Sequence, residues 1–187
     1  MPLYSYVVLL AFTLLGVVFF FQAVRIRSEG SEFMGKPSID KYYFFSGKVA
    51  IFTTWALFIL KAIMPKTGYF PSPVFLCWIA AGILWIGVII VIFSIVGLGG
   101  SLKVGLPREE TSLQTKGIYL LSRNPLYLGI YLICIASCLY FIDLINIVFT
   151  IYGVYIHHQI IKGEELFLTR RFGKDWTNYT AQVRRYL

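Results

Sequence analysis

The chain has 187 residues, of which 58% are hydrophobic and 14% charged, and its mean hydropathy is +0.73. A water-soluble domain of this size has too little interior to bury so much apolar surface, so the composition excludes a soluble globular protein and indicates an integral membrane protein. The net charge of +8 requires no nucleic-acid partner, because membrane topology and attraction to anionic lipid headgroups account for it.

Long uncharged runs predict the membrane spans in chain order. Residues 2–24 contain no charged side chain, and 23 residues at ~1.5 Å each suffice to cross about 30 Å of hydrocarbon. Residues 46–64 predict a second span, in which Lys48 and Lys61 extend to opposite interfaces. Residues 74–97 lie within a longer uncharged run and predict the third span.

Residues 124–161 contain one charged residue, Asp143, in 38 positions. One helix of this length would extend ~57 Å, about twice the thickness of the hydrocarbon. We therefore predict a helical hairpin that turns near Asp143 and Asn146 and forms the fourth and fifth spans. The expected fold is all-α, a polytopic membrane protein of about five transmembrane helices in a single domain, residues 1–187.

The basic residues predict the orientation of this five-span arrangement. Fifteen of the 17 Lys and Arg residues fall on one side, and only Lys61 and Lys66 fall on the other. By the positive-inside rule, the N-terminus lies outside and the C-terminus is cytoplasmic.

The three cysteines, Cys77, Cys134 and Cys138, fall inside predicted spans. Cys134 and Cys138 share a helix face, but packing accounts for them better than a metal or redox pair does. We therefore expect no metal site.

A helix-start signal opens the fourth span. Asn124 is a good N-cap, and Pro125 suits the first helical position. A helix N-terminus also presents free N–H groups and a partial positive charge, here beside Arg123, which suits an anion. The pattern fits either a capped helix with an interfacial arginine or an anion-binding site.

Two adjacent carboxylates, Glu164 and Glu165, follow the last span. Carboxylates near a helix C-terminus oppose the helix dipole, and ionisable residues at membrane depth often mark function. His157 lies about two turns before Glu164 on the same face, and His158 lies likewise before Glu165. The pair either ends the helix in water or supplies a functional carboxylate.

Taken together, these motifs resemble the isoprenylcysteine carboxyl methyltransferase and phospholipid methyltransferase superfamily. The matching residues are Gly117-Ile-Tyr119, Arg123-Asn-Pro-Leu-Tyr127-Leu-Gly129, Glu164-Glu165, Phe172-Gly173 and Tyr179. The resemblance covers residues 97–187, downstream of the N-terminal spans in residues 1–96. Asn124 replaces the usual histidine, so this position can donate a hydrogen bond but cannot take up a proton.

The resemblance implies a methyltransferase that binds S-adenosylmethionine in a cytoplasmic pocket and receives a lipophilic substrate from the bilayer. It assigns the following residues to the cofactor pocket: Tyr119, Arg123, Asn124, Pro125, Tyr127, Leu128, Gly129, Glu164 and Glu165. Within this set, the ring faces of Tyr119 and Tyr127 suit the sulfonium cation of the cofactor.

The methyl acceptor stays open at this point, because a carboxylate needs no general base whereas an amine or a thiol does. Glu164 and His157 are the catalytic candidates for a base, with His158 as an alternative. Arg184 or Arg185 is the candidate to neutralise a carboxylate substrate.

The C-terminal segment from Asp175 predicts an amphipathic cytoplasmic helix that lies on the membrane or covers the pocket. The residues at helical spacing are Phe172, Trp176, Tyr179, Val183 and Leu187.

Two other classes of function are compatible with a small helical membrane protein. One is an integral-membrane reductase with a nicotinamide cofactor, which would need more phosphate-binding basic residues. The other is a non-enzymatic transporter or assembly protein, which would need polar residues deep in several spans.

Overall fold

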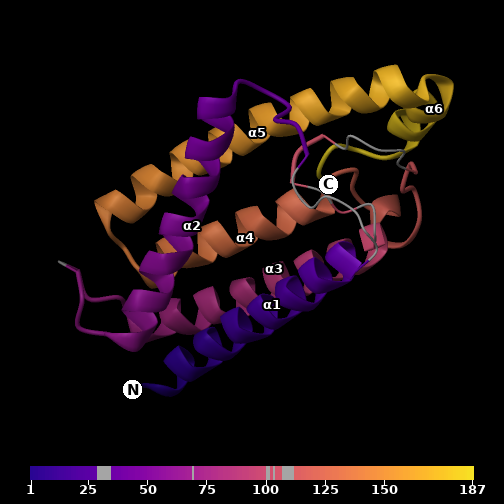
Figure 1. The fold of residues 1–187 in the computed structure, drawn as a ribbon. Helices are drawn as coiled ribbons and strands as arrows, with labels where there is room; N and C mark the ends of the chain where they lie inside the picture. Colours follow the sequence, from indigo (N-terminus) through magenta and orange to yellow (C-terminus); the bar gives the residue numbers. More distant parts are fainter. Residues whose placement is uncertain (29–34, 69, 100–101, 103, 107–111) are drawn as a thin grey trace.

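The computed structural model describes residues 1–28, 35–68, 70–99, 102, 104–106 and 112–187. Over these ranges the chain forms six α-helices, one short 3-10 helix and no β-strand, as expected for an all-α fold (Figure 1). The elements are α1 (Leu3–Ser28), α2 (Lys41–Ile63), α3 (Val74–Leu98), η2 (Gly117–Leu120), α4 (Pro125–Tyr140), α5 (Leu144–Phe172) and α6 (Lys174–Gln182).

Four of the helices, α1, α2, α3 and α5, are long and apolar enough to cross a membrane. Helix α4 has 16 residues, about 24 Å of length, which is shorter than the ~30 Å hydrocarbon layer. Large apolar side chains such as Leu10 and Phe20 are exposed on the outer faces of the bundle, as in proteins surrounded by lipid. Four candidate spans are therefore present, and a fifth crossing by α4 remains our proposal.

The predicted break between the last two spans is present, and α4 and α5 run in opposite directions on either side of it (Figure 1). Asp143 caps α5 by accepting hydrogen bonds from the backbone N–H groups of Ile145 and Asn146. Asn146 itself belongs to the helix rather than to the turn. Its buried amide donates to the carbonyl of Phe141 and accepts from Ser137, so it fastens the turn from inside α5.

Close helix contacts hold the bundle together. Helix α3 packs against α4 where Gly87 faces Gly129, and a Cβ atom built at Gly129 would lie 2.7 Å from the carbonyl oxygen of Gly87. Helix α2 packs against α5 where Gly47 meets Ile156 and Gly153 meets Ile51. Small residues at these crossings let the backbones approach closely, as in membrane helix pairs generally.

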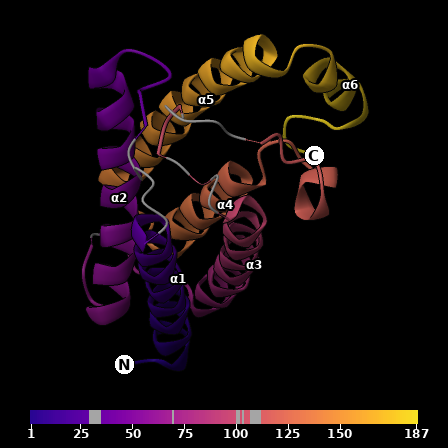
Figure 2. The same ribbon diagram turned by 45° about the vertical axis from the view of Figure 1, so that its right-hand side comes forward.

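We predicted the last span to end at residue 161. Helix α5 continues past this residue to Phe172. It ends at Gly173, whose φ of +50° lies in the region that favours glycine. The following helix, α6, stops at Gln182, so the expected helical spacing does not extend to Leu187, which is 74% exposed. The C-terminus lies at the end of the bundle opposite the N-terminus (Figures 1 and 2).

The predicted orientation can be tested by labelling two exposed positions. We expect a cysteine at Lys66 to react with an impermeant maleimide in intact cells and a cysteine at Lys116 to react only after lysis, because the positive-inside rule places them on opposite sides. Lys103 and Arg108, which contribute to the basic count, lie outside the described residues. If the cysteine at position 116 reacted in intact cells and the cysteine at position 66 did not, the orientation would be the opposite of the predicted one.

Candidate functional site

A pocket of about 170 Å³ lies where the start of α4, the end of α5, η2 and α6 meet. This is the end of the bundle remote from the N-terminus (Figure 2). Six residues that the family resemblance assigned to the cofactor pocket are among those that line it: Tyr119, Arg123, Asn124, Pro125, Tyr127 and Glu164. Although they come from η2, α4 and α5 and the turn before α4, the fold brings them to one cavity.

A carboxylate and a phenol form the polar centre of the pocket wall. The hydroxyl of Tyr127 donates a hydrogen bond to Oε1 of Glu164 at 2.9 Å. Within the described part of the chain, no hydrogen-bond or ion-pair partner engages Oε2 of Glu164. One carboxylate oxygen thus stays available to accept a hydrogen bond from a ligand or to attract a cation.

Aromatic side chains form much of the remaining wall. Tyr119, Trp176 and Tyr179 all line the pocket and are at most 7% exposed. The hydroxyl of Tyr179 donates to the carbonyl oxygen of Tyr119 at 2.6 Å and so ties α6 to η2. Burial raises the pKa of Tyr179 to about 12, so this phenol keeps its proton, and the tie, at neutral pH.

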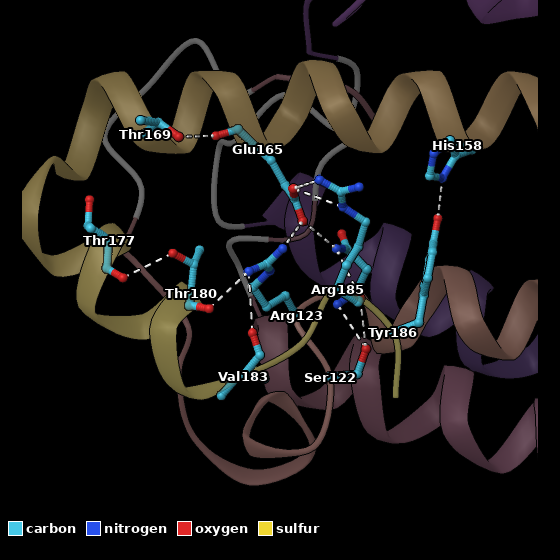
Figure 3. A network of polar contacts seen from close by, with 11 residues as sticks. Ser122, Arg123, His158, Glu165, Thr169, Thr177, Thr180, Val183, Arg185 and Tyr186 are labelled. Atoms are coloured by element: carbon cyan, nitrogen blue, oxygen red, sulfur yellow. Dashed lines mark hydrogen bonds and ion pairs between the residues drawn. The ribbon is translucent and has the colours of Figure 1, made fainter.

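The second carboxylate, Glu165, is bound by cations rather than directed into the pocket (Figure 3). Its Oε2 accepts hydrogen bonds from Nε and Nη2 of Arg185 at 3.0 and 2.7 Å. Its Oε1 lies 3.3 Å from Nη2 of Arg123 and accepts from Nδ2 of Asn124 at 3.0 Å. Hydrogen bonding to Glu165 raises the pKa of Arg185. Glu165 is thus an anchor that compensates two arginines in a buried setting.

Asn124 occupies the N-cap position of α4, with Pro125 at the first helical position as predicted. Its side chain makes no capping hydrogen bond, contrary to our prediction, because the amide donates to Glu165 and to the carbonyl of Arg185 instead. Asparagine therefore acts here as a neutral donor, a role that requires no titratable group.

The C-terminal strap, residues 183–186, lies across the turn that precedes α4. The backbone N–H of Arg123 donates to the carbonyl of Arg184 at 2.9 Å, and the hydroxyl of Ser122 donates to the carbonyl of Arg185. The hydroxyl of Tyr186 and Nδ1 of His158 are 2.6 Å apart (Figure 3). The strap thus fixes one wall of the site to α5.

Several residues that were predicted to belong to the site do not line the pocket. Gly129 faces α3 rather than the pocket, because a side chain there would collide with Gly87. Leu128 is on the first turn of α4 but is not among the lining residues. The side chain of Arg184 is exposed, so Arg185 is the arginine that turns inward. His157 is 3% exposed and hydrogen-bonds through Nδ1 to the carbonyl of Gly153.

His157 lies behind the pocket wall. Its ring centroid is 5.9 Å from that of Tyr127, and it does not line the cavity itself. Because the carbonyl of Gly153 can only accept, Nδ1 carries the hydrogen and Nε2 of the neutral ring is unprotonated.

Sequence reasoning missed the partners of Glu165 and the contribution of the strap. No local pattern links Arg185 with Glu165 or Ser122, because these contacts depend on the fold of the chain after α6. The aromatic periodicity of the C-terminal segment did mark Trp176 and Tyr179, which cover the pocket.

The residues present suit a zwitterionic cofactor such as S-adenosylmethionine. Nε of Arg123 is buried and has no hydrogen-bond partner in the described part of the structure, so it can serve an anionic group. The carboxylate of Glu164 supplies an acceptor on the same wall, and the aromatic faces suit a sulfonium. A donor, an acceptor and a cation-binding wall are therefore available in one cavity.

Membrane-length helices with a pocket at one end define the class of this molecule, an integral membrane protein with a polar site near the ends of its helices. The phospholipid methyltransferase family model matches residues 75–175, more than half of the chain. The chain therefore belongs to the phospholipid methyltransferase family. A search of curated proteins found no match. The match begins within α3, upstream of the motifs that carried the resemblance.

Proposed function

We propose that this protein transfers a methyl group from S-adenosylmethionine to the amine of a lipid-like acceptor at the cytoplasmic side of the membrane. The cofactor, when bound, supplies an electrophilic methyl group and leaves as a neutral thioether. The observation that carries the proposal is the pocket that the Tyr127–Glu164 pair lines together with aromatic side chains. Family membership supports the reaction type.

We assign cofactor binding mainly to the residues at the N-terminal end of α4 and on η2. Nε of Arg123 suits the methionyl carboxylate, and the backbone around Asn124 and Pro125 suits the adenine edge. Tyr119 and Trp176 present ring faces to the cationic sulfur. Exclusion of water by this wall and orientation of the reactants supply most of the acceleration.

Glu164 carries the catalytic role in this proposal. An amine arrives as an ammonium ion, so it must lose a proton before its nitrogen lone pair can form the new N–CH₃ bond. Oε2 of Glu164 accepts that proton while Oε1 stays bonded to Tyr127. His157, whose ring centroid lies 5.9 Å from that of Tyr127 behind the pocket wall, is the second candidate base.

The same carboxylate argues for an amine over the carboxylate of an isoprenylcysteine. A carboxylate acceptor would meet like charge at Glu164, and Glu165 already occupies Arg185, the inward arginine of the strap. Since Arg184 is exposed and we assign Arg123 to the methionyl carboxylate of the cofactor, that alternative lacks a further neutralising group in the wall of the pocket.

Binding and turnover measured side by side test the proposal. Calorimetry on purified protein should detect S-adenosylhomocysteine but not reduced nicotinamide dinucleotide. Labelled methyl groups from S-adenosylmethionine should then appear in phosphatidylethanolamine rather than in a prenylated cysteine. If the protein bound the nicotinamide dinucleotide and not S-adenosylhomocysteine, the methyltransferase proposal would be wrong. If only the prenylated cysteine were methylated, the acceptor would be a carboxylate and not an amine.

A further inference from the structure

Two loop segments that are far apart in the sequence pair with each other beside the pocket. The first, residues 35–38, precedes α2, and the second, residues 104–106, lies between α3 and η2. The backbone N–H of Lys36 donates to the carbonyl of Leu106 at 2.8 Å, and the N–H of Leu106 donates to the carbonyl of Lys36 at 2.7 Å. Together the two segments form an antiparallel loop pair.

The second segment of the loop pair belongs to the pocket wall. Gly105 and Leu106 are among the residues that line the cavity. Gly105 has a φ of +96°, a conformation that favours glycine, and a Cβ atom built there would lie 2.5 Å from the carbonyl oxygen of Lys36. The backbone of Lys36 therefore lies directly against this part of the wall.

The first segment of the loop pair also packs on α5, immediately before Glu164. The hydroxyl of Ser38 donates to the carbonyl of Ile160 at 3.1 Å. Gly163 lies so close to the backbone of Ser38 that a Cβ atom at Gly163 would be 3.0 Å from the carbonyl carbon of Ser38. Glu164 is the next residue of the helix. The loop pair therefore connects the pocket wall with the turn of α5 that carries Glu164.

An apolar cluster joins the loop pair to the hydrogen-bond partner of Glu164. Phe44 and Ile160 belong to this cluster and are at most 1% exposed. The residues packed against it are Ile39, Val104 and Tyr127. Because closely packed side chains transmit displacements, a shift of either loop segment would also be felt at Tyr127.

We propose that residues 35–38 position the methyl-donor site, by holding the Gly105–Leu106 wall in register with Glu164 through the contact with Gly163. A misplacement of about 1 Å can cost about 100-fold in a reaction that depends on orientation. The inference rests on the proposed function. It gives a role in the site to residues that precede the segment matching the family, residues 75–175.

Gly163→Ala tests the contact with Ser38. Gly82→Ala is the matched control, because Gly82 also lies inside a long helix and a Cβ atom there would meet nothing within 4 Å. Alanine favours a helix over glycine, which offsets part of the stability that the collision at Gly163 removes. Ser38→Ala, which removes only the hydrogen bond to Ile160, is a milder variant of the same contact.

We expect Gly163→Ala to weaken S-adenosylhomocysteine binding about fivefold or more and to slow single-turnover methyl transfer about tenfold or more, because both depend on the placement of the walls. Ser38→Ala should cause smaller losses in the same direction. Gly82→Ala should change neither quantity by more than about twofold. The melting temperature in detergent should fall little in any of the three variants, so that lost folding does not explain the losses.

Hydrogen–deuterium exchange gives a readout that needs neither turnover nor ligand. The amides of Lys36 and Leu106 are protected by their mutual hydrogen bonds. In Gly163→Ala these amides should exchange faster than in the wild type, because displacement of Ser38 loosens the loop pair. In Gly82→Ala their exchange should match the wild type.

A reversible cross-link distinguishes a fixed wall from one that must open. In an antiparallel pair that exchanges two hydrogen bonds, the Cα atoms lie about 5.5 Å apart, within the range that a disulfide spans. The double variant Lys36→Cys, Leu106→Cys should therefore form a disulfide on oxidation, and its reduced form is the control. Oxidation should leave S-adenosylhomocysteine affinity within about twofold, since positioning requires no opening.

Three results would overturn the inference. Unchanged binding and amide exchange in Gly163→Ala would show that the contact with Ser38 does not position the site. Equal losses in Gly82→Ala would make the effect one of helix packing in general. Loss of ligand binding on oxidation of the double variant would mean that the loop pair must open. If the wild type itself did not bind S-adenosylhomocysteine, the proposed function would fail, whereas unchanged amide exchange in Gly163→Ala would overturn the positioning contact alone.

Discussion

Replacement of Glu165 by alanine should lower the free energy of unfolding by about 1.5–3 kcal/mol, because it removes charge-assisted hydrogen bonds from a partly buried cluster and leaves its partners uncompensated. Glu165 is 8% exposed and holds Arg123, Arg185 and the amide of Asn124. Its loss would free the C-terminal strap as well as the turn before α4. Thermal denaturation in detergent, followed by the near-ultraviolet signal of the buried Trp176, measures the effect.

The matched control for this variant is Asp175→Ala, which removes an exposed carboxylate from the first turn of α6. It should lower the melting temperature far less, since an exposed charge near a helix N-terminus contributes about 0.3–1 kcal/mol. A double variant that removes both Glu165 and Arg185 should be less destabilised than the sum of the single variants. Full additivity, or a Glu165→Ala protein as stable as the wild type, would contradict the anchor role.

Replacement of Glu164 by glutamine should reduce methyl transfer to an amine acceptor by about 100-fold or more, the range typical of a lost general base. Glutamine keeps the size of the side chain and its hydrogen bond with Tyr127, but it cannot accept a proton. Single-turnover kinetics with labelled S-adenosylmethionine measure the chemical step apart from binding.

Tyr127→Phe is the companion variant, because it removes the hydroxyl and keeps the carboxylate. It should slow transfer less than Glu164→Gln does. A folded Glu164→Gln protein whose rate stays within threefold of the wild type would rule out Glu164 as the general base.

The positions of the helices could be predicted well from the sequence because hydropathy is a property of each segment by itself. The ends were less predictable. Helix α1 continues through Arg25 and Arg27 to Ser28, since a charged residue ends a hydrocarbon span but not a helix. Helix α2 begins earlier than the uncharged run, at Lys41, because Asp40 accepts hydrogen bonds from the first turn.

The candidate site could be predicted in part. Motif residues such as Tyr119, Tyr127 and Glu164 do line one pocket, because the spacing of the motifs reflects the elements that carry them. The different environments of Glu164 and Glu165 could not be predicted from the sequence, in which the two residues are adjacent. One points to Tyr127 and the other to Arg185, since neighbours on a helix project about 100° apart and meet different elements.

The position of Lys48 was not predicted from the sequence. A lysine near the end of an apolar run is ordinarily expected to reach the interface. Here the side chain is half-buried, and its ammonium lies 4.6 Å from the ring centroid of Phe44.

A structure of the protein bound to S-adenosylhomocysteine tests the central claim most directly, that the pocket beside the Tyr127–Glu164 pair is the methyl-donor site. We predict density for the ligand between Tyr119, Trp176 and Glu164, with its amino-acid end near Nε of Arg123. Density at another place on the helices, with this pocket unchanged at saturating ligand, would contradict the account.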